Sequence, residues 1–152
     1  MRVSAKADYA LRAAVELAAH GDDGPLKGEL ISQAQNIPLR FLENILGELR
    51  IAGILDSRRG AEGGYLLARP ATEIQLGDVI RAVDGPLANV MGARPEALEY
   101  TGASAPLREV WVAVRTSLRQ VLDEVTLADV AAGTLPSEVI QMTESPEAWQ
   151  PR

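Results

Sequence analysis

The segment ILDSRRGAEGGYLLARP, residues 54–70, decides the fold. Two short apolar runs, residues 54–55 and 65–68, flank a connection that contains Arg58, Arg59 and three glycines. Apolar runs joined by a glycine-rich connection are typical of a β-hairpin. The turn of this hairpin would carry two adjacent guanidinium groups on a backbone that can approach another surface closely.

The residues before the hairpin predict three helices. Ser4 is a candidate N-cap for a first, alanine-rich helix over residues 4–20. A second helix is expected over residues 27–35, followed by a short turn and a third helix from Pro38 to Gly53. Two helices joined by a tight turn and followed by a basic hairpin are the layout of a winged DNA-binding domain. We therefore expect residues 1–86 to form a winged helix-turn-helix domain, completed by a short helix near residues 76–83.

The second part of the chain predicts a loop, a long helix and a tail. Residues 87–105 have little periodicity and contain glycine and proline, so we interpret them as a loop. Residues 106–132 hold the strongest helical pattern of the chain, and residues 133–152 are expected to be a flexible tail. The predicted fold class is mainly α with a small β-hairpin. The apolar stripe of the long helix comprises Leu107, Val110, Trp111, Val114, Leu118, Val121, Leu122 and Val125.

This stripe has two interpretations. It could pack on the winged domain of its own chain, or it could pair with the same helix of a second copy. The second interpretation is favoured because no further sizeable domain is available to cover the stripe, and two-fold homodimers are the commonest assemblies. A homodimer would also place two DNA readers on successive half-sites of a palindromic operator.

The third helix would be the reader of the major groove. Arg40 could contact phosphate or guanine, Asn44 could pair with adenine, and Glu43 could accept from cytosine. Phe41 could contact a thymine methyl group or could instead be a core residue, and Glu43 could be a solvated surface residue. The predicted DNA-facing residues of this helix are Pro38, Arg40, Phe41, Glu43 and Asn44.

The hairpin and the start of the first helix supply the other predicted DNA contacts. One of the hairpin arginines could enter a narrow minor groove, or the two could form surface pairs with carboxylates such as Glu62. The helix start could bind phosphate, although Tyr9 could equally pack on the core. These predicted contacts are Arg58, Arg59, Gly60 and Tyr65 in the hairpin, with Ser4, Lys6 and Tyr9 at the helix start.

Composition excludes several other classes of function. The chain has no cysteine and one histidine, His20, so it lacks the residues of a thiolate or multi-histidine metal site. It holds no Ser/His/Asp or Cys/His constellation and no phosphate-binding loop, so we expect no enzyme. No run approaches the roughly 20 apolar residues of a membrane span, and we expect a cytoplasmic protein. The net charge of −6 lies wholly in residues 71–152, because residues 1–70 hold equal numbers of basic and acidic residues.

Several blocks of the sequence resemble the Rrf2 family of winged-helix transcriptional regulators. They are MRVSAKADYALRA, IPLRFLENILGELRIAGIL, SRRGAEGGYLLARP, EIQLGDVIRAVDGPLA and the closing LREVW and LDEVTLADV, in this order. The resemblance implies a homodimer with crossed long helices, and a recognition helix and wing in double-stranded DNA. It makes Arg59 the arginine of the wing. The alternative is a winged-helix module that docks proteins and does not bind DNA.

One departure from the family concerns its cofactor. Many members hold an iron–sulfur cluster with three cysteines in the loop before the long helix and a histidine near the start of that helix. This chain has no cysteine, and Arg108 stands where that histidine would be, so we expect no cofactor and no metal. Cluster-free relatives respond to a small metabolite or a partner protein. Candidate pocket residues are Met91, Arg94, Tyr100, Arg108 and Trp111, although Trp111 could instead lie in the dimer core.

Overall fold

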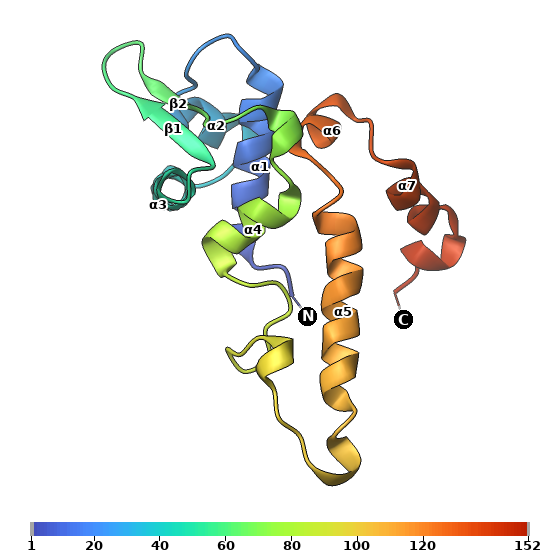
Figure 1. Cartoon of the computed structure of the whole chain (residues 1–152). Coiled ribbons are helices and arrows are strands. Elements are labelled where there is room, and N and C mark those ends of the chain that lie inside the picture. The colour runs from blue at the N-terminus through green and yellow to red at the C-terminus, as the bar shows by residue number, and fades with distance from the viewer. Residues whose placement is uncertain (1, 152) are drawn as a thin grey trace.

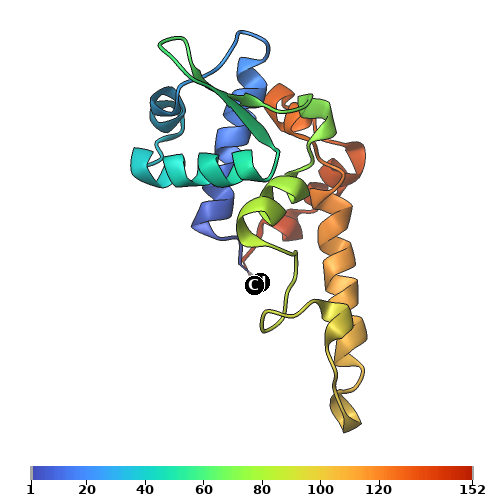
Figure 2. The same cartoon turned by 60° about the vertical axis from the view of Figure 1, so that its left-hand side comes forward.

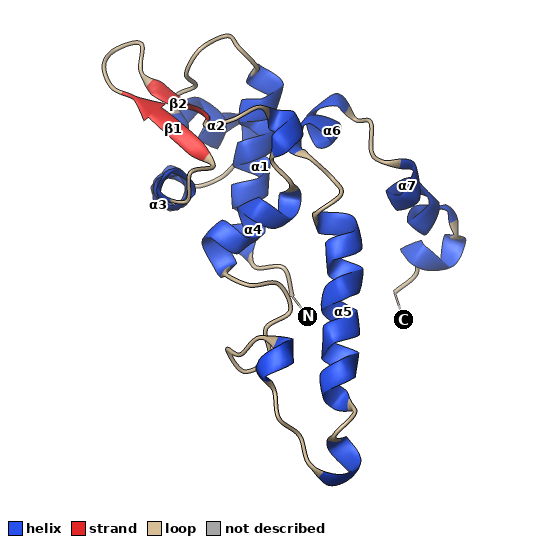
Figure 3. Cartoon of the chain, viewed as in Figure 1, coloured by secondary structure: helices blue, strands red, loops and turns tan. Residues whose placement is uncertain are grey.

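The computed structural model describes residues 2–151. It is mainly helical with one antiparallel hairpin in the described part, which confirms the predicted fold class (Figure 3). The helices and the hairpin of residues 5–84 form a head, from which a long helix over residues 107–122 extends beside a loop (Figures 1 and 2). None of the helices in residues 2–151 is long and apolar enough to span a membrane.

Helix α1, Ala5–His20, is the central element of the head. The Ser4 hydroxyl accepts a hydrogen bond from the Ala7 backbone N–H at 2.9 Å, which caps the helix as its sequence predicts. Four buried alanines give this helix a smooth face, on which the helices over residues 28–35, 39–51, 76–84 and 127–132 pack closely. These alanines are Ala7, Ala10, Ala13 and Ala14. Gly21 ends the helix.

Helices α2, Gly28–Gln35, and α3, Leu39–Ile51, form the helix-turn-helix unit. Asn36 ends α2 in the left-handed region with φ of 51°, a conformation that asparagine tolerates. Ile37 is buried in the turn, and Pro38 precedes the first turn of α3. The inward face of α3 follows the predicted spacing and comprises Leu42, Ile45, Leu46 and Leu49.

Strands β1, Leu55–Arg58, and β2, Gly64–Leu67, form the predicted hairpin, with a register that runs from Leu55 opposite Leu67 to Arg58 opposite Gly64. Leu26, just before α2, adds a bridge to Tyr65, in which each residue donates its N–H to the other's carbonyl at 2.8 Å. The hairpin is therefore attached to the start of the helix-turn-helix unit as well as to the end of α3.

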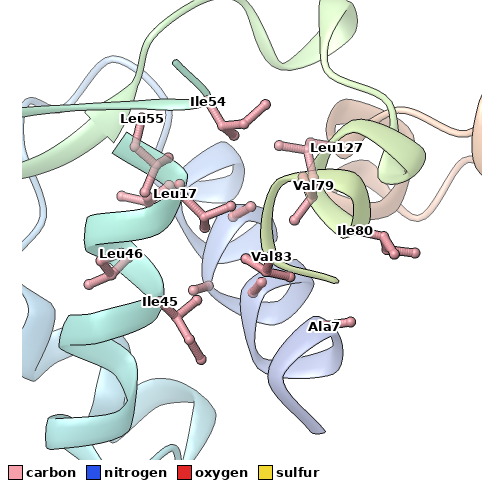
Figure 4. Packing of buried hydrophobic residues seen from close by; sticks show 14 of the residues in the cluster. Ala7, Leu17, Ile45, Leu46, Ile54, Leu55, Val79, Ile80, Val83 and Leu127 are labelled. Atoms are coloured by element: carbon pink, nitrogen blue, oxygen red, sulfur yellow. The ribbon is translucent and has the colours of Figure 1, made fainter. Parts of the chain in front are cut away.

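Helix α4, Leu76–Asp84, follows a short 3₁₀ turn, η1, Ala71–Glu73, and completes the core of the head. Figure 4 shows its residues Val79 and Val83 on the side of α1, while Ile80 points away from α1. Ile54, just before β1, and Leu55 lie above α3 in the same view. Leu127 of α6 is fully buried beside α4. The core thus joins residues from both ends of the chain.

The predicted long helix is interrupted, which corrects the expectation of one dimerisation helix over residues 106–132. Helix α5 covers Leu107–Leu122, and a separate α6 covers Leu127–Ala132. Between them the chain turns back: Leu76 N–H donates to the Val125 carbonyl at 3.0 Å, and Leu127 N–H donates to the Ile74 carbonyl at 2.9 Å. A capping box at Thr126 and Asp129 then starts α6. The continuous apolar pattern concealed this break.

The expected tail contains more secondary structure than the sequence indicated. Helix α7, Ser137–Glu144, and a 3₁₀ turn, η4, Pro146–Trp149, form within residues 133–152. The indole N–H of Trp149 donates to the Thr143 carbonyl at 2.7 Å, so the turn folds back on α7. No residue of α7 is buried, which explains why no core pattern marked it in the sequence.

Candidate nucleic-acid interface

The outer face of α3 carries the predicted groove-reading residues. Arg40, Phe41, Glu43 and Asn44 are all exposed, as is Pro38 at the cap position. Phe41 is 59% exposed, so the alternative that it is a core residue is wrong. An exposed phenylalanine between polar residues on one helix face can contact thymine methyl groups while its neighbours reach base edges.

The turn of the hairpin presents the two predicted arginines to solvent. Arg58 ends β1, and Arg59 and Gly60 follow in the turn, all three of them exposed. Within residues 2–151 neither arginine forms an ion pair, so the alternative pairing with Glu62 is not formed. Figures 1 and 2 show the hairpin and α3 on the same side of the head, away from the start of α5. Both guanidinium groups are therefore available to an external phosphate or groove.

Gly63 and Gly64 make the hairpin's close approaches to other backbone. A Cβ atom on Gly64 would lie 2.5 Å from the Leu26 carbonyl oxygen, and Gly64 has φ of +153°. A Cβ atom on Gly63 would collide with the carbonyl oxygen of Arg58. Both contacts are with backbone, which cannot rotate away as a side chain can. The glycines thus fix the shape of the turn that carries Arg58 and Arg59.

Tyr65 has a different setting from its predicted DNA contact. Its side chain is half-buried against the hydrophobic core, and one ring carbon would lie 3.8 Å from a Cβ on Gly28. The ring thus lies beside the start of α2. Tyr65 thus joins the hairpin to the start of α2. This role depends on tertiary contacts, which the local sequence does not indicate.

The start of α1 is bound to its own chain, which differs from the phosphate-binding role expected there. Ser4 Oγ donates to Asp84 Oδ2 at 2.6 Å. Lys6 Nζ lies 2.7 Å from Glu48 Oε2 and donates to the Val83 carbonyl at 2.8 Å. Tyr9 is half-buried against the core. These side chains hold α1 against α3 and α4, so the polar groups of Ser4 and Lys6 already have partners within the chain.

Arg12 has a role that sequence reasoning missed. Its guanidinium lies 5.4 Å from the centre of the Tyr9 ring and 3.3 Å from Asp8. Its Nε also donates to the Gln35 side chain at 3.3 Å. Arg12 thus connects α1 to the last residue of α2 and steadies the turn before α3. The i, i+4 spacing of Asp8 and Arg12 was the only local signal for it.

The predicted apolar stripe on α5 is partly exposed. None of its residues is buried, and Leu107 and Val110 are 40% and 48% exposed. The other members on α5 are half-buried: Trp111, Val114, Leu118, Val121 and Leu122. Val125 is a wrong member of the set, because it lies beyond α5 and is 2% exposed within its own chain. Its side chain is not available to a second copy.

The predicted effector residues lie in separate places. The Trp111 indole N–H donates to the Tyr100 hydroxyl at 3.1 Å, so these two aromatic residues do meet. Met91 is 99% exposed, and Arg108 is exposed beside Glu109. Arg94 lines a different cavity, between α4 and α5. The five residues therefore do not enclose one pocket, since the loop over residues 87–105 spreads them along α5.

An exposed reading face on the second helix of a helix-turn-helix unit, with a basic hairpin beside it, defines the class of winged-helix transcriptional regulators. The sequence profile of the Rrf2 family, described as an iron-dependent transcriptional regulator, matches residues 3–133. The chain belongs to the Rrf2 family.

Relatives of known name support this assignment over nearly the whole chain. The sequence is 49% identical over 150 residues to Rv1287 of Mycobacterium tuberculosis, an HTH-type regulator by its name, covering 99% of this chain and 93% of that protein. The structure of CymR, the global cysteine regulator of Bacillus subtilis, matches with a TM-score of 0.75 and 37% identity, covering 88% and 98% of the two chains. IscR of T. potens matches with a TM-score of 0.72 and 33% identity, covering 98% and 97%. These relatives are transcriptional regulators rather than enzymes.

The donor set of this chain does not fit an iron–sulfur cluster. Such clusters are held by cysteine thiolates, with histidine as an occasional substitute. The chain has no cysteine, and its one histidine, His20, lies at the end of α1 in the head. The described residues also contain no cluster of three or more histidine and acidic side chains placed to hold a metal ion. This chain therefore lacks the ligands for the iron that the family's description names.

Proposed function

We propose that this protein is a homodimeric, cluster-free repressor that binds a palindromic operator in the cytoplasm and responds to a small metabolite or a partner protein. The observation that carries the proposal is the joint exposure of the α3 face and of Arg58 and Arg59 on one side of the head. The absence of ion pairs at the two arginines, among the described residues, leaves their charge free to attract phosphate.

The partly exposed stripe of α5 supports the dimer. Seven apolar side chains lie along one face of a helix with no buried residue. Pairing two such helices about a two-fold axis would bury both stripes at once and hold two heads in a fixed relation. Each head would then address one half-site, and bound protein would block access to the DNA it covers.

Duplex binding at two salt concentrations tests the DNA-reading part of the proposal. Fragments of the source genome selected on the protein would supply the operator, and fluorescence anisotropy would give its affinity. Binding should weaken steeply between 50 and 200 mM salt, by about 10³-fold or more for six or more phosphate contacts, because counterions are released. A protein that binds no duplex at either concentration would instead be a docking module.

The variant Arg59→Ala tests the role of the wing. If Arg59 enters a groove, its loss should weaken operator binding by about 1–3 kcal/mol. Arg108→Ala is the matched control, since it removes the same charge at the start of α5, the end far from the hairpin in Figures 1 and 2. Equal affinities for the two variants would remove the wing from the binding mechanism.

A further inference from the structure

A cavity of about 290 Å³ lies between α4, the loop before α5 and α5 itself, outside the surface formed by α3 and the hairpin. Four arginines line it: Arg81 from α4, Arg94 from the loop, and Arg115 and Arg119 from α5. Residues 71–151 contain five arginines and no lysine, and four of the five line this one cavity. In the acidic half of the chain, the positive charge is therefore concentrated at a single place.

The acidic residues nearby neutralise only part of this charge. Arg81 Nη2 donates to both carboxylate oxygens of Asp123, at 2.6 and 2.7 Å. Arg115 pairs with Glu96. Arg94 and Arg119 form no ion pair within the described residues and are both exposed. The cavity therefore holds two guanidinium groups without an ion-pair partner among the described residues, next to two paired ones.

Arg115 is the deepest of the four arginines. Its side chain is 15% exposed, and its Nε–H is buried with no acceptor among residues 2–151. Its hydrogen bond to Glu96 uses Nη1 alone, although a guanidinium has five N–H donors. The pKa of the Glu96 carboxyl is lowered, first by its own backbone N–H and then by the Arg115 guanidinium. Glu96 thus stays ionised and keeps Arg115 in place, while the buried Nε–H of Arg115 has no acceptor among the described residues.

We propose that this cavity binds a small, multiply charged oxyanion, a compact metabolite with phosphate, sulfate or carboxylate groups. Arginine is the side chain best suited to such groups, because its planar fork donates two parallel hydrogen bonds to a pair of oxygens. The cavity volume is near the lower end of the range of about 300–1,000 Å³ for small-molecule sites. A ligand of a few heavy atoms fits it, and a dinucleotide does not.

The site joins the two working parts of the molecule. Arg81 belongs to α4, which packs on α1 in the head, whereas Arg115 and Arg119 lie one turn apart on α5. An anion held between them would fix the position of the head relative to α5. This regulatory consequence rests on the proposed function, while oxyanion binding itself does not. The ligand would act by favouring one arrangement of head and α5 over another.

Isothermal titration calorimetry tests the site, with inorganic phosphate, sulfate and citrate as separate probes. These probes distinguish tetrahedral oxyanions from carboxylates. At least one should bind saturably to the wild-type protein, and the double variant Arg94→Gln/Arg119→Gln should bind it at least ten-fold more weakly. Both arginines are exposed and without ion-pair partners in the described residues, so the variant should fold. Arg108→Gln, which removes an arginine of α5 that does not line the cavity, should bind like wild type.

Two results would overturn the site: no saturable binding of any probe, or equal affinity of the double variant and the wild type. Operator affinity without ligand should be unchanged, within about two-fold, in the double variant. If the wild type binds no duplex DNA, the proposed function fails, and the calorimetry still decides the oxyanion site. If duplex binding is intact and calorimetry shows no binding, the site fails and the proposed function stands.

Discussion

Gly64 is the residue on which the shape of the wing most depends. Its backbone lies against Leu26, the residue that also bridges to Tyr65. A side chain at this position would push the hairpin away from the start of α2. The hairpin can lie this close to Leu26, just before α2, only because Gly64 has no Cβ atom.

The variant Gly64→Ala should therefore be destabilised by about 1–3 kcal/mol, the usual cost of forcing extra atoms into a packed site. Gly47→Ala is the matched control, because a Cβ there meets nothing within 4 Å and lies inside α3, where alanine favours the helix by about 0.5–1 kcal/mol. Urea unfolding followed by circular dichroism measures both. A Gly64→Ala protein as stable as Gly47→Ala would show that the close approach to Leu26 is dispensable.

At the residue scale, the sequence predicted those positions whose setting is local. The exposure of Arg40, Arg58 and Arg59 follows from helix periodicity and from turn chemistry. Lys6 and Tyr65 could not be placed in this way, because their partners come from distant segments: Lys6 contacts Val83, 77 positions away. A basic or aromatic side chain looks the same in sequence whether it faces solvent or another helix.

At the scale of elements, a capping box starts α6 after the break that follows α5. The Thr126 hydroxyl accepts from the Asp129 N–H at 3.2 Å, and Asp129 Oδ2 accepts from the Thr126 N–H at 2.8 Å. The pattern of threonine followed three positions later by an acidic residue is visible in the sequence. The apolar residues before this pattern favour a continuous helix instead, because Leu122 and Val125 keep the helical spacing. The capping pattern and the apolar spacing therefore predict different structures at this point, and the structure follows the capping pattern.

Thr126→Ala should reduce the free energy of unfolding by about 0.5–2 kcal/mol, the usual loss for a helix N-cap. Glu124→Ala should remain close to wild type, because Glu124 is exposed and outside the capping box. Thermal unfolding of the three proteins at neutral pH measures the difference. Equal melting temperatures for all three would mean that the core contact of Leu127 alone positions α6.

The same box predicts a dependence on pH. The pKa of Asp129 is lowered from its ordinary value of 3.8, first by the hydrogen bond from the Thr126 hydroxyl and then by the Thr126 backbone N–H. Because the pKa is lower in the folded state, this contribution to stability is complete above pH 3.8 and is lost as the pH falls through the folded-state value. The stability difference between wild type and Asp129→Ala should therefore be constant from pH 5 to 7 and shrink below pH 3.8. Urea titrations at each pH would show it; a difference that grows on acidification would contradict the assignment.

At the scale of the whole molecule, the exposed stripe of α5 predicts self-association. Val110→Glu would place a charge on the apolar face of the proposed helix pair, and the isolated chain would tolerate it because Val110 is already 48% exposed. Sedimentation velocity should show a dimer for wild type and a monomer for Val110→Glu. Thr116→Glu is the control, since Thr116 is exposed on the opposite face of α5 and should leave the dimer intact. A monomeric wild type would rule out the homodimer.

The bridge between Leu26 and Tyr65 has a consequence for how the protein meets different operators. Two hydrogen bonds join the hairpin at Tyr65 to Leu26, two residues before α2, so we expect the hairpin and the helix-turn-helix unit to move together. The hairpin and α3 would then be unable to shift relative to each other when the groove width of a half-site changes. In the proposed dimer, any tolerance for half-site spacing would therefore come from the junction of α4 with α5, or from bending of the DNA itself. Each head of the dimer would then keep a fixed shape, and the distance between the two heads would be set at the junction of α4 with α5.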